Sequence, residues 1–148
     1  MWYRIRYHID VRVVLDSNVL VAGFRSRRGA SFRLLQWLKA GRFEIAISVP
    51  LALEYEAELI RHAGLLGWHR DEAEGLVDYL CQIAHRQAIH FLWRPTLTDP
   101  KDEFIVELAV AAGCDALVTH NLRDFAGASG MVRVMPPSEF LRVVEETS

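Results

Sequence analysis

The sequence predicts an α/β fold built on a mostly parallel sheet. Short continuous apolar runs rich in β-branched residues, typical of buried strands, alternate with longer segments whose apolar residues recur at helical spacing. Strands connected through helices are expected to lie parallel and to be joined by right-handed crossovers. The chain has 148 residues without repeats or linkers, so residues 1–148 are expected to form a single domain with its own core.

The composition is typical of a globular protein, with 51% hydrophobic and 24% charged residues. The net charge of −2 argues against a uniformly basic nucleic-acid binder, so contact with nucleic acid requires a local basic patch. Cys81 and Cys114 are far apart and lack metal-ligand spacing, which favours reduced thiols in a cytoplasmic protein. No apolar run is long enough to span a membrane, and the first residues lack the apolar centre of a signal peptide.

The first half of the chain is expected to begin with a β-branched strand at residues 11–15. Residues 2–10 alternate apolar and polar side chains, which indicates an extension of that strand, an added edge strand or an extension without structure. A helix is expected at residues 30–40, ended by Gly41. A second strand is expected at residues 43–48, followed by a helix that carries Pro50 in its first turn and runs to about residue 63.

The second half is expected to open with a helix capped by Asp71, in which Leu76, Val77 and Leu80 recur at helical spacing. Gly113 is expected to end a later helix. The remaining elements expected are a strand at 89–93, a helix at 102–112, strands at 116–119 and 132–135, and a last helix at 137–145.

Four acidic residues stand where expected strands pass into helices or where helices begin. They are Asp16, Glu54, Asp102 and Asp124. In parallel sheets ligands bind beyond the carboxyl ends of the strands, so these side chains are expected to share one pocket. Clustered carboxylates repel one another and are held together by a hard cation such as Mg²⁺ or Mn²⁺, which favours metal-assisted phosphoryl chemistry. Taken singly, Asp16 is equally explained as a helix cap and Glu54 as part of a solvated helix face beside Glu56 and Glu58.

Polar and basic residues near these acids extend the candidate site. Asn18 and Thr119 are positioned to orient a carboxylate or contact substrate, and Asn121 offers a neutral oxygen ligand to a metal. The cluster of Arg25, Arg27 and Arg28 after the first strand could hold a phosphate backbone, although a solvated loop is the commoner explanation for such a cluster.

Together these segments resemble the PIN domain family, in particular its VapC-type toxins. The likeness covers roughly residues 11–142 and rests on the order of five motifs. They are VVLDSNVL at 13–20, SVPLALE at 48–54, DPKD at 99–102, DALVTHNLRDF at 115–125 and PSEFL at 137–141. The resemblance implies a three-layer α/β/α sandwich and an endoribonuclease that uses Mg²⁺ or Mn²⁺. It further implies an RNA substrate, a small antitoxin protein as partner, and a homodimer.

The resemblance also implies roles for individual residues. Asp16, Glu54 and Asp102 take the places of three catalytic acids, with Asp16 and Asp102 as metal ligands. The fourth acid of the family commonly follows a Thr-Gly pair, at the position that Asn121 occupies here. Asp124 is expected to compensate for that missing charge as a catalytic and metal-binding residue.

Two other functions are compatible with the same residues. The first is a PIN fold that binds RNA or a protein without cleaving it, which the Asn121 substitution favours. The second is a metal-dependent phosphatase or another small α/β hydrolase, suggested by Asp16 at a strand end. A haloacid dehalogenase-like enzyme would need a second aspartate two residues after Asp16, where Asn18 stands instead.

Overall fold

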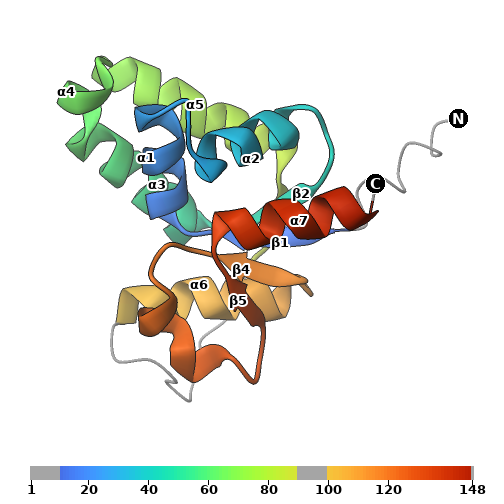
Figure 1. The fold of residues 1–148 in the computed structure, drawn as a ribbon. Coiled ribbons are helices and arrows are strands. Elements are labelled where there is room, and N and C mark those ends of the chain that lie inside the picture. The colour runs from blue at the N-terminus through green and yellow to red at the C-terminus, as the bar shows by residue number, and fades with distance from the viewer. Residues whose placement is uncertain (1–10, 90–99, 148) are drawn as a thin grey trace, which may run out of the picture.

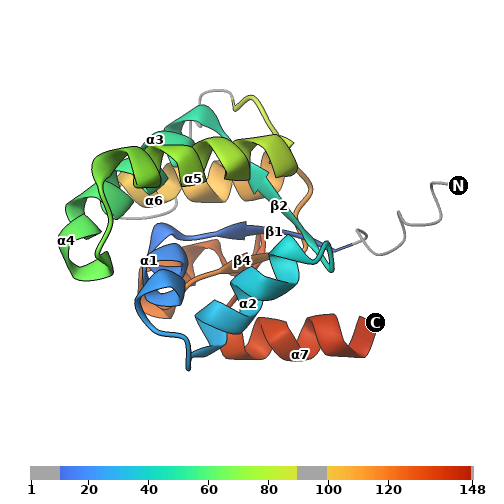
Figure 2. The same cartoon turned by 90° about the horizontal axis from the view of Figure 1, so that it is seen from above.

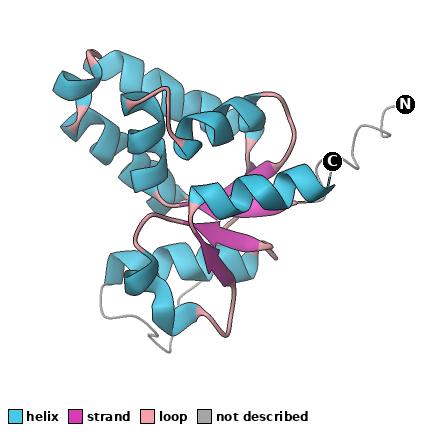
Figure 3. Cartoon of the chain, viewed as in Figure 1, coloured by secondary structure: helices cyan, strands magenta, loops and turns pink. Residues whose placement is uncertain are grey.

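The computed structural model describes residues 11–89 and 100–147. Its centre is a five-stranded sheet, and Figures 1 and 3 show how the helices surround it. The strand order is β3-β2-β1-β4-β5, and every strand pairing is parallel. The strands are β1 (Arg12–Leu15), β2 (Glu44–Ile47), β3 (His85–Arg86), β4 (Ala116–Val118) and β5 (Arg133–Met135). The predicted α/β fold with a mostly parallel sheet is therefore confirmed.

Helices cover both faces of the sheet. They are α1 (Ser17–Arg25), α2 (Ala30–Lys39), α3 (Val49–Arg61), α4 (Ala63–Leu66), α5 (Arg70–Ile83), α6 (Pro100–Ala111), the 3₁₀ helix η2 (Leu122–Ala128) and α7 (Pro137–Thr147). Figure 2 shows α3, α5 and α6 on one side of the sheet and α2 and α7 on the other. This is the three-layer α/β/α arrangement. None of the described helices is long and apolar enough to cross a membrane.

The two central strands are fully enclosed by these helices. All side chains from Val13 to Leu15 and from Ala116 to Val118 are buried, as expected for parallel strands covered on both faces. Val13 lies opposite Ala116 and Leu15 opposite Val118, so the two strands end together at the same edge of the sheet. The residues that follow β1 and β4 are consequently neighbours in space.

Some elements differ from the sequence prediction. Residues 17–25 form helix α1, which the sequence did not predict because the run from Val19 to Val21 is as compatible with a strand as with a helix. The third strand was predicted at 89–93, but β3 lies at His85–Arg86 and Ile89 follows it outside any strand. Residues 90–93 of that prediction and the pattern at 2–10 lie outside the described residues.

Helix α5 begins differently from the prediction that Asp71 caps it. His69 is the N-cap, and the Glu72 carboxylate accepts a hydrogen bond from the His69 backbone N–H at 2.8 Å. Asp71 lies in the first turn, where its negative charge interacts favourably with the helix dipole, but it is not the capping residue. The prediction placed the start of this helix two residues too late.

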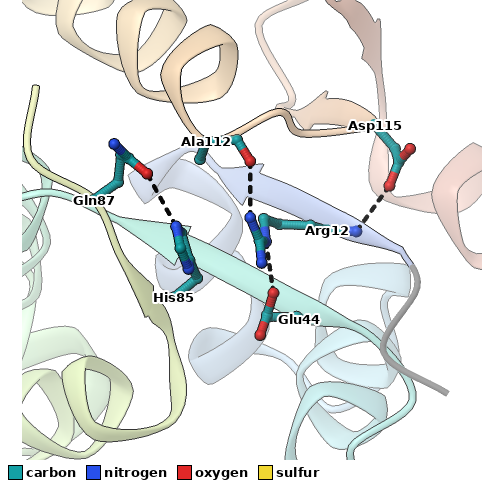
Figure 4. A network of polar contacts seen from close by, with 6 residues as sticks. All are labelled: Arg12, Glu44, His85, Gln87, Ala112 and Asp115. Atoms are coloured by element: carbon teal, nitrogen blue, oxygen red, sulfur yellow. Dashed lines mark hydrogen bonds and ion pairs between the residues drawn. The ribbon is translucent and has the colours of Figure 1, made fainter. Parts of the chain in front are cut away.

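Charged residues pair at the amino edge of the sheet, where the strands begin (Figure 4). The Arg12 side chain at the start of β1 donates to Glu44 at the start of β2 and, at 2.8 Å, to the carbonyl of Ala112. The Arg12 backbone N–H donates to the Asp115 carboxylate at 2.9 Å. On the neighbouring strand β3, His85 contacts Gln87 at 3.0 Å. These contacts join β1, β2 and the end of α6 at the edge opposite the candidate site.

Candidate active site at the carboxyl edge of the sheet

The carboxyl ends of β1 and β4 mark the point at which the chain connections diverge. After β1 the chain passes through α1 and α2 to β2 on one side, and after β4 it passes through η2 to β5 on the other. Ligands of parallel α/β sheets bind at such a switch point because the diverging connections leave a crevice. Asp16 directly follows β1 there, and its backbone N–H donates to the Val118 carbonyl at 2.9 Å.

Asp16 is a buried carboxylate, with 6% of its surface exposed. It occupies the N-cap position of α1, but its side chain makes no capping hydrogen bond. Instead its Oδ2 accepts a hydrogen bond from the Thr119 hydroxyl at 2.7 Å. Burial raises the pKa of Asp16 above its ordinary value of 3.8, the Thr119 hydrogen bond opposes this, and the charge of Asp124 raises it further. Helix capping therefore does not account for Asp16.

Thr119 connects the segments that follow the two central strands. Its hydroxyl oxygen accepts from the Asn121 backbone N–H at 2.9 Å and from the Asn18 side chain at 3.5 Å. The Asn18 amide oxygen in turn accepts from the backbone N–H of His120 at 3.3 Å. The His120 ring contacts the Ser31 hydroxyl of α2 at 2.9 Å. These bonds fix the first turn of α1 against the loop after β4 and orient Asp16.

Glu54 is brought to the same place by helix α3. Ser48 caps this helix by accepting from the Leu51 N–H at 3.3 Å, and Pro50 occupies the first turn as predicted. The buried Tyr55 hydroxyl donates to the Leu15 carbonyl at 2.5 Å, which ties α3 to the end of β1. Glu54 then receives a hydrogen bond from the Ser17 hydroxyl at 3.2 Å. The pKa of Tyr55 is raised well above its ordinary value, by burial first and then by the charges of Asp16 and Glu54.

A pocket of about 460 Å³ opens over these residues and brings the four predicted acids together. Of the predicted site residues, those that line it are Asp16, Asn18, Arg25, Glu54, Asp102, Asn121 and Asp124. Asp102 comes from the first turn of α6, and Asp124 from the first turn of η2. Thr119 is fully buried and supports Asp16, whereas the exposed Arg27 and Arg28 are not among the lining residues.

The pocket also contains residues that the sequence did not single out. Glu58, Arg61 and His62 line it together with Glu54, and they follow Glu54 by four, seven and eight positions. Residues at that spacing lie on one face of a helix, so they could have been predicted from the sequence as the residues that share a helix face with Glu54. In the same way Val21 and Ala22 line the pocket from the face of α1 that carries the predicted residues Asn18 and Arg25. The sequence missed Val21 and Ala22 because α1 itself was not predicted.

The donor set of the pocket suits a hard divalent cation. Its candidate ligands are carboxylate oxygens and the Asn121 amide, the oxygen ligands that hard cations prefer. Cys114 does not line the pocket, and burial raises the pKa of its thiol to about 12, so the thiol stays neutral. Within residues 11–89 and 100–147, however, no three His, Cys, Asp or Glu side chains lie close enough to enclose one ion. Mg²⁺ typically binds through one or two carboxylates and keeps several waters, so the pocket fits a hydrated ion better than a closed protein cage.

The fold and the pocket define an α/β protein with an acidic site at the switch point of a parallel sheet. A sequence model of the PIN domain family matches residues 12–123. The chain therefore belongs to the PIN domain family. It is similar in fold to a chain in the crystal structure of VapBC2 from Rickettsia felis bound to a DNA fragment from their promoter. The TM-score is 0.58 at 15% identity, covering 85% of this chain and 98% of that one. No curated protein sequence matches the chain.

Proposed function

We propose that this protein is an endoribonuclease that hydrolyses RNA phosphodiester bonds with the help of Mg²⁺ or Mn²⁺. The observation that carries the proposal is the convergence of Asp16, Glu54, Asp102 and Asp124 on one pocket. These acids come from four separate parts of the chain, and a folded protein gains no stability from bringing like charges together. Such a cluster is understandable if a cation offsets the repulsion during function.

In this proposal the residues of the pocket have distinct tasks. Asp16, oriented by Thr119, and Asp102 would hold the ion, with Asn121 as a neutral oxygen ligand. Glu54, oriented by Ser17, and Asp124 would help to place a second ion or the attacking water. A bound divalent ion lowers the pKa of coordinated water and offsets negative charge on the phosphoryl oxygens. Without that ion, the same acidic side chains would repel a phosphodiester.

The proposal is tested by comparing purified wild type with Asp16→Asn on single-stranded RNA in Mn²⁺, in Mg²⁺ and in EDTA. Wild type is expected to cleave RNA with either metal and to lose activity in EDTA, whereas Asp16→Asn loses cleavage under all conditions. Asp78→Asn removes an exposed aspartate on α5, outside the pocket, and is expected to retain full activity. Equal cleavage by wild type and Asp16→Asn would refute the assignment. Turnover of small phosphomonoesters without RNA cleavage would instead indicate a phosphatase.

The second candidate function is a PIN fold that binds RNA or a protein without cleaving it. Asn121 favours this alternative, because it places an uncharged amide in the pocket where an acid would strengthen metal binding. Calorimetric titration with Mn²⁺ separates the two functions. Binding that disappears in Asp16→Asn supports the nuclease, and the absence of binding at millimolar Mn²⁺ supports the inert module.

We further propose that the protein is the toxin of a toxin–antitoxin pair, with a small antitoxin as partner and a homodimeric assembly. The support is family membership together with the likeness of fold to the VapBC2 structure. Induced expression in a bacterial host is expected to arrest growth, and Asp16→Asn is expected to relieve the arrest. Growth arrest that persists in Asp16→Asn would count against a toxic nuclease activity.

A further inference from the structure

The pocket is acidic at one end and basic at the other. Besides the acids near the sheet, its lining includes Arg25, Arg61 and His62, together with Glu58, which forms an ion pair with Arg61. Arg25 is the last residue of α1 and Arg61 the last residue of α3, and these two helices pack against each other. The hydrogen bond between Ser17 and Glu54 joins the first turn of α1 to the first half of α3. The two helices therefore run side by side away from the sheet, with their cations at the far end.

The separation between the two ends can be obtained from helix geometry. Arg25 follows Asn18 by seven positions on α1, and Arg61 follows Glu54 by seven positions on α3. Seven residues correspond to about 10 Å along a helix axis. On α3 the acid Glu54 and the cation Arg61 are thus about 10 Å apart along the helix axis, and on α1 Asn18, two residues after Asp16, is about as far from Arg25. One extended ligand with two negatively charged groups could contact both ends.

The basic end is organised by α3 itself. Glu58 accepts two hydrogen bonds from the Arg61 guanidinium, at 2.8 and 3.3 Å, which hold that side chain over the pocket. The His62 ring contacts the Glu58 carbonyl through Nδ1 at 2.9 Å, and a carbonyl only accepts, so Nδ1 is the donor in this contact. Within the described part of the chain Arg25 makes no ion pair. Arginine binds phosphate with two parallel N–H groups, which suits it to a backbone phosphate.

We propose that Arg25 and Arg61 bind a second backbone phosphate of the RNA, about 10 Å from the acids that would hold a cation at the scissile one. This inference rests on the proposed function, because it assumes that the acid end receives a phosphodiester. It assigns the pocket to an oligonucleotide longer than a single dinucleotide. It also separates Arg25, which lines the pocket, from Arg27 and Arg28, which do not.

The experiment measures binding of a fluorescent single-stranded oligoribonucleotide by anisotropy in EDTA, over a range of KCl concentrations. Arg61→Gln is compared with Arg70→Gln, a matched control, because Arg70 on α5 forms a similar exposed ion pair with Glu74 outside the pocket. Arg61→Gln and Arg25→Gln are each expected to weaken binding roughly tenfold and to lower the salt slope by about 0.7. Arg70→Gln is expected to stay within twofold of wild type. Thermal unfolding verifies that each variant is folded.

The inference is overturned if Arg61→Gln and Arg70→Gln bind equally well, or if the salt slope of Arg61→Gln equals that of wild type. A cleavage assay distinguishes this failure from failure of the proposed function. With a dinucleotide substrate, which lacks the second phosphate, wild type and Arg61→Gln are expected to have the same kcat/KM. With a longer RNA, Arg61→Gln is expected to raise KM at an unchanged kcat. If wild type cleaves no RNA but the binding differences persist, the nuclease proposal fails and the phosphate site remains.

Discussion

At the scale of single residues, the buried Asp16 shows that a residue of the candidate site can lower the stability of the folded protein. Its carboxylate is buried next to the hydrophobic ends of β1 and β4, and it accepts hydrogen bonds from the Thr119 hydroxyl and from the Ser17 backbone. Burial favours the neutral form, and the charge of Asp124 adds to this preference. An ionised Asp16 therefore destabilises the folded state until a cation offsets the charge. Buried acids with this property are characteristic of functional sites.

Asp16→Asn is expected to be more stable than wild type at neutral pH without metal. Because the pKa of Asp16 is raised in the folded state, the wild type loses stability as the pH rises from 3.8 through the raised pKa, and the loss is constant above it. The asparagine does not ionise, so its advantage should vanish in acid. Urea denaturation of both proteins across this pH range measures the difference in the free energy of unfolding.

A divalent metal ion should make wild type the more stable of the two proteins. Added Mn²⁺ is expected to raise the Tm of wild type and to leave that of Asp16→Asn unchanged, because only the ionised carboxylate attracts the cation. A wild type that is the more stable of the two in EDTA at neutral pH would contradict the electrostatic account.

At the scale of secondary structure, the close packing of α1 against α2 explains a glycine inside a helix. Gly23 is buried in α1, and a Cβ atom there would overlap the end of the Leu35 side chain and lie 3.1 Å from the Ser31 backbone oxygen. Glycine normally weakens a helix, which is one reason why the sequence did not predict α1. Here it allows α2 to approach, and Ser31 of α2 reaches His120 beside the site.

A pair of glycine substitutions tests this packing. Gly23→Ala is expected to lower the free energy of unfolding by about 1 kcal/mol, because overpacking outweighs the gain in helix propensity. Gly75→Ala in α5 has no neighbouring atom within 4 Å and is expected to raise it by about 0.5–1 kcal/mol. Denaturant unfolding measures both. An increase of stability in both variants would show that α1 and α2 are not closely packed at Gly23.

At the scale of the whole molecule, the two edges of the sheet have different tasks. At the amino edge, charges are paired: Arg12 bonds to Glu44 and to the end of α6, and Asp115 accepts from the Arg12 backbone (Figure 4). At the carboxyl edge, acids gather in a pocket instead. The parallel arrangement produces this division, because all strands begin at one edge and end at the other. The paired charges and the proposed site therefore lie at opposite edges of the sheet.

The substitution Arg12→Gln tests whether the paired charges at the amino edge affect stability without affecting the site at the carboxyl edge. The substitution removes a charge-assisted bond to the partly buried Glu44 and is expected to lower stability by about 1–2 kcal/mol. Nuclease activity below the unfolding temperature is expected to equal that of wild type, because Arg12 is remote from the lining of the pocket. Parallel measurements of unfolding and of RNA cleavage test both parts. Loss of activity at full stability would show that the edges are not independent.

The sequence by itself determined the class of fold and the four acids of the pocket. The strands predicted at 11–15 and 116–119 are short, continuous apolar runs, and Asp16 and Asp124 follow them closely, so local pattern identified these elements. Glu54 and Asp102 stand in predicted helices, and their assignment to the site also rested on the resemblance to the PIN domain family. Only the tertiary structure decided the remainder of the site. Arg61 and His62 reach the pocket because α3 packs against α1, and Gly23 is tolerated because α2 lies against it. Helical spacing places Arg61 and His62 on the same face of α3 as Glu54, but the packing of α3 against α1 depends on contacts between segments remote in sequence. Local periodicity does not encode such contacts, which is the physical reason why only the folded protein brings Arg61 and His62 together with Arg25.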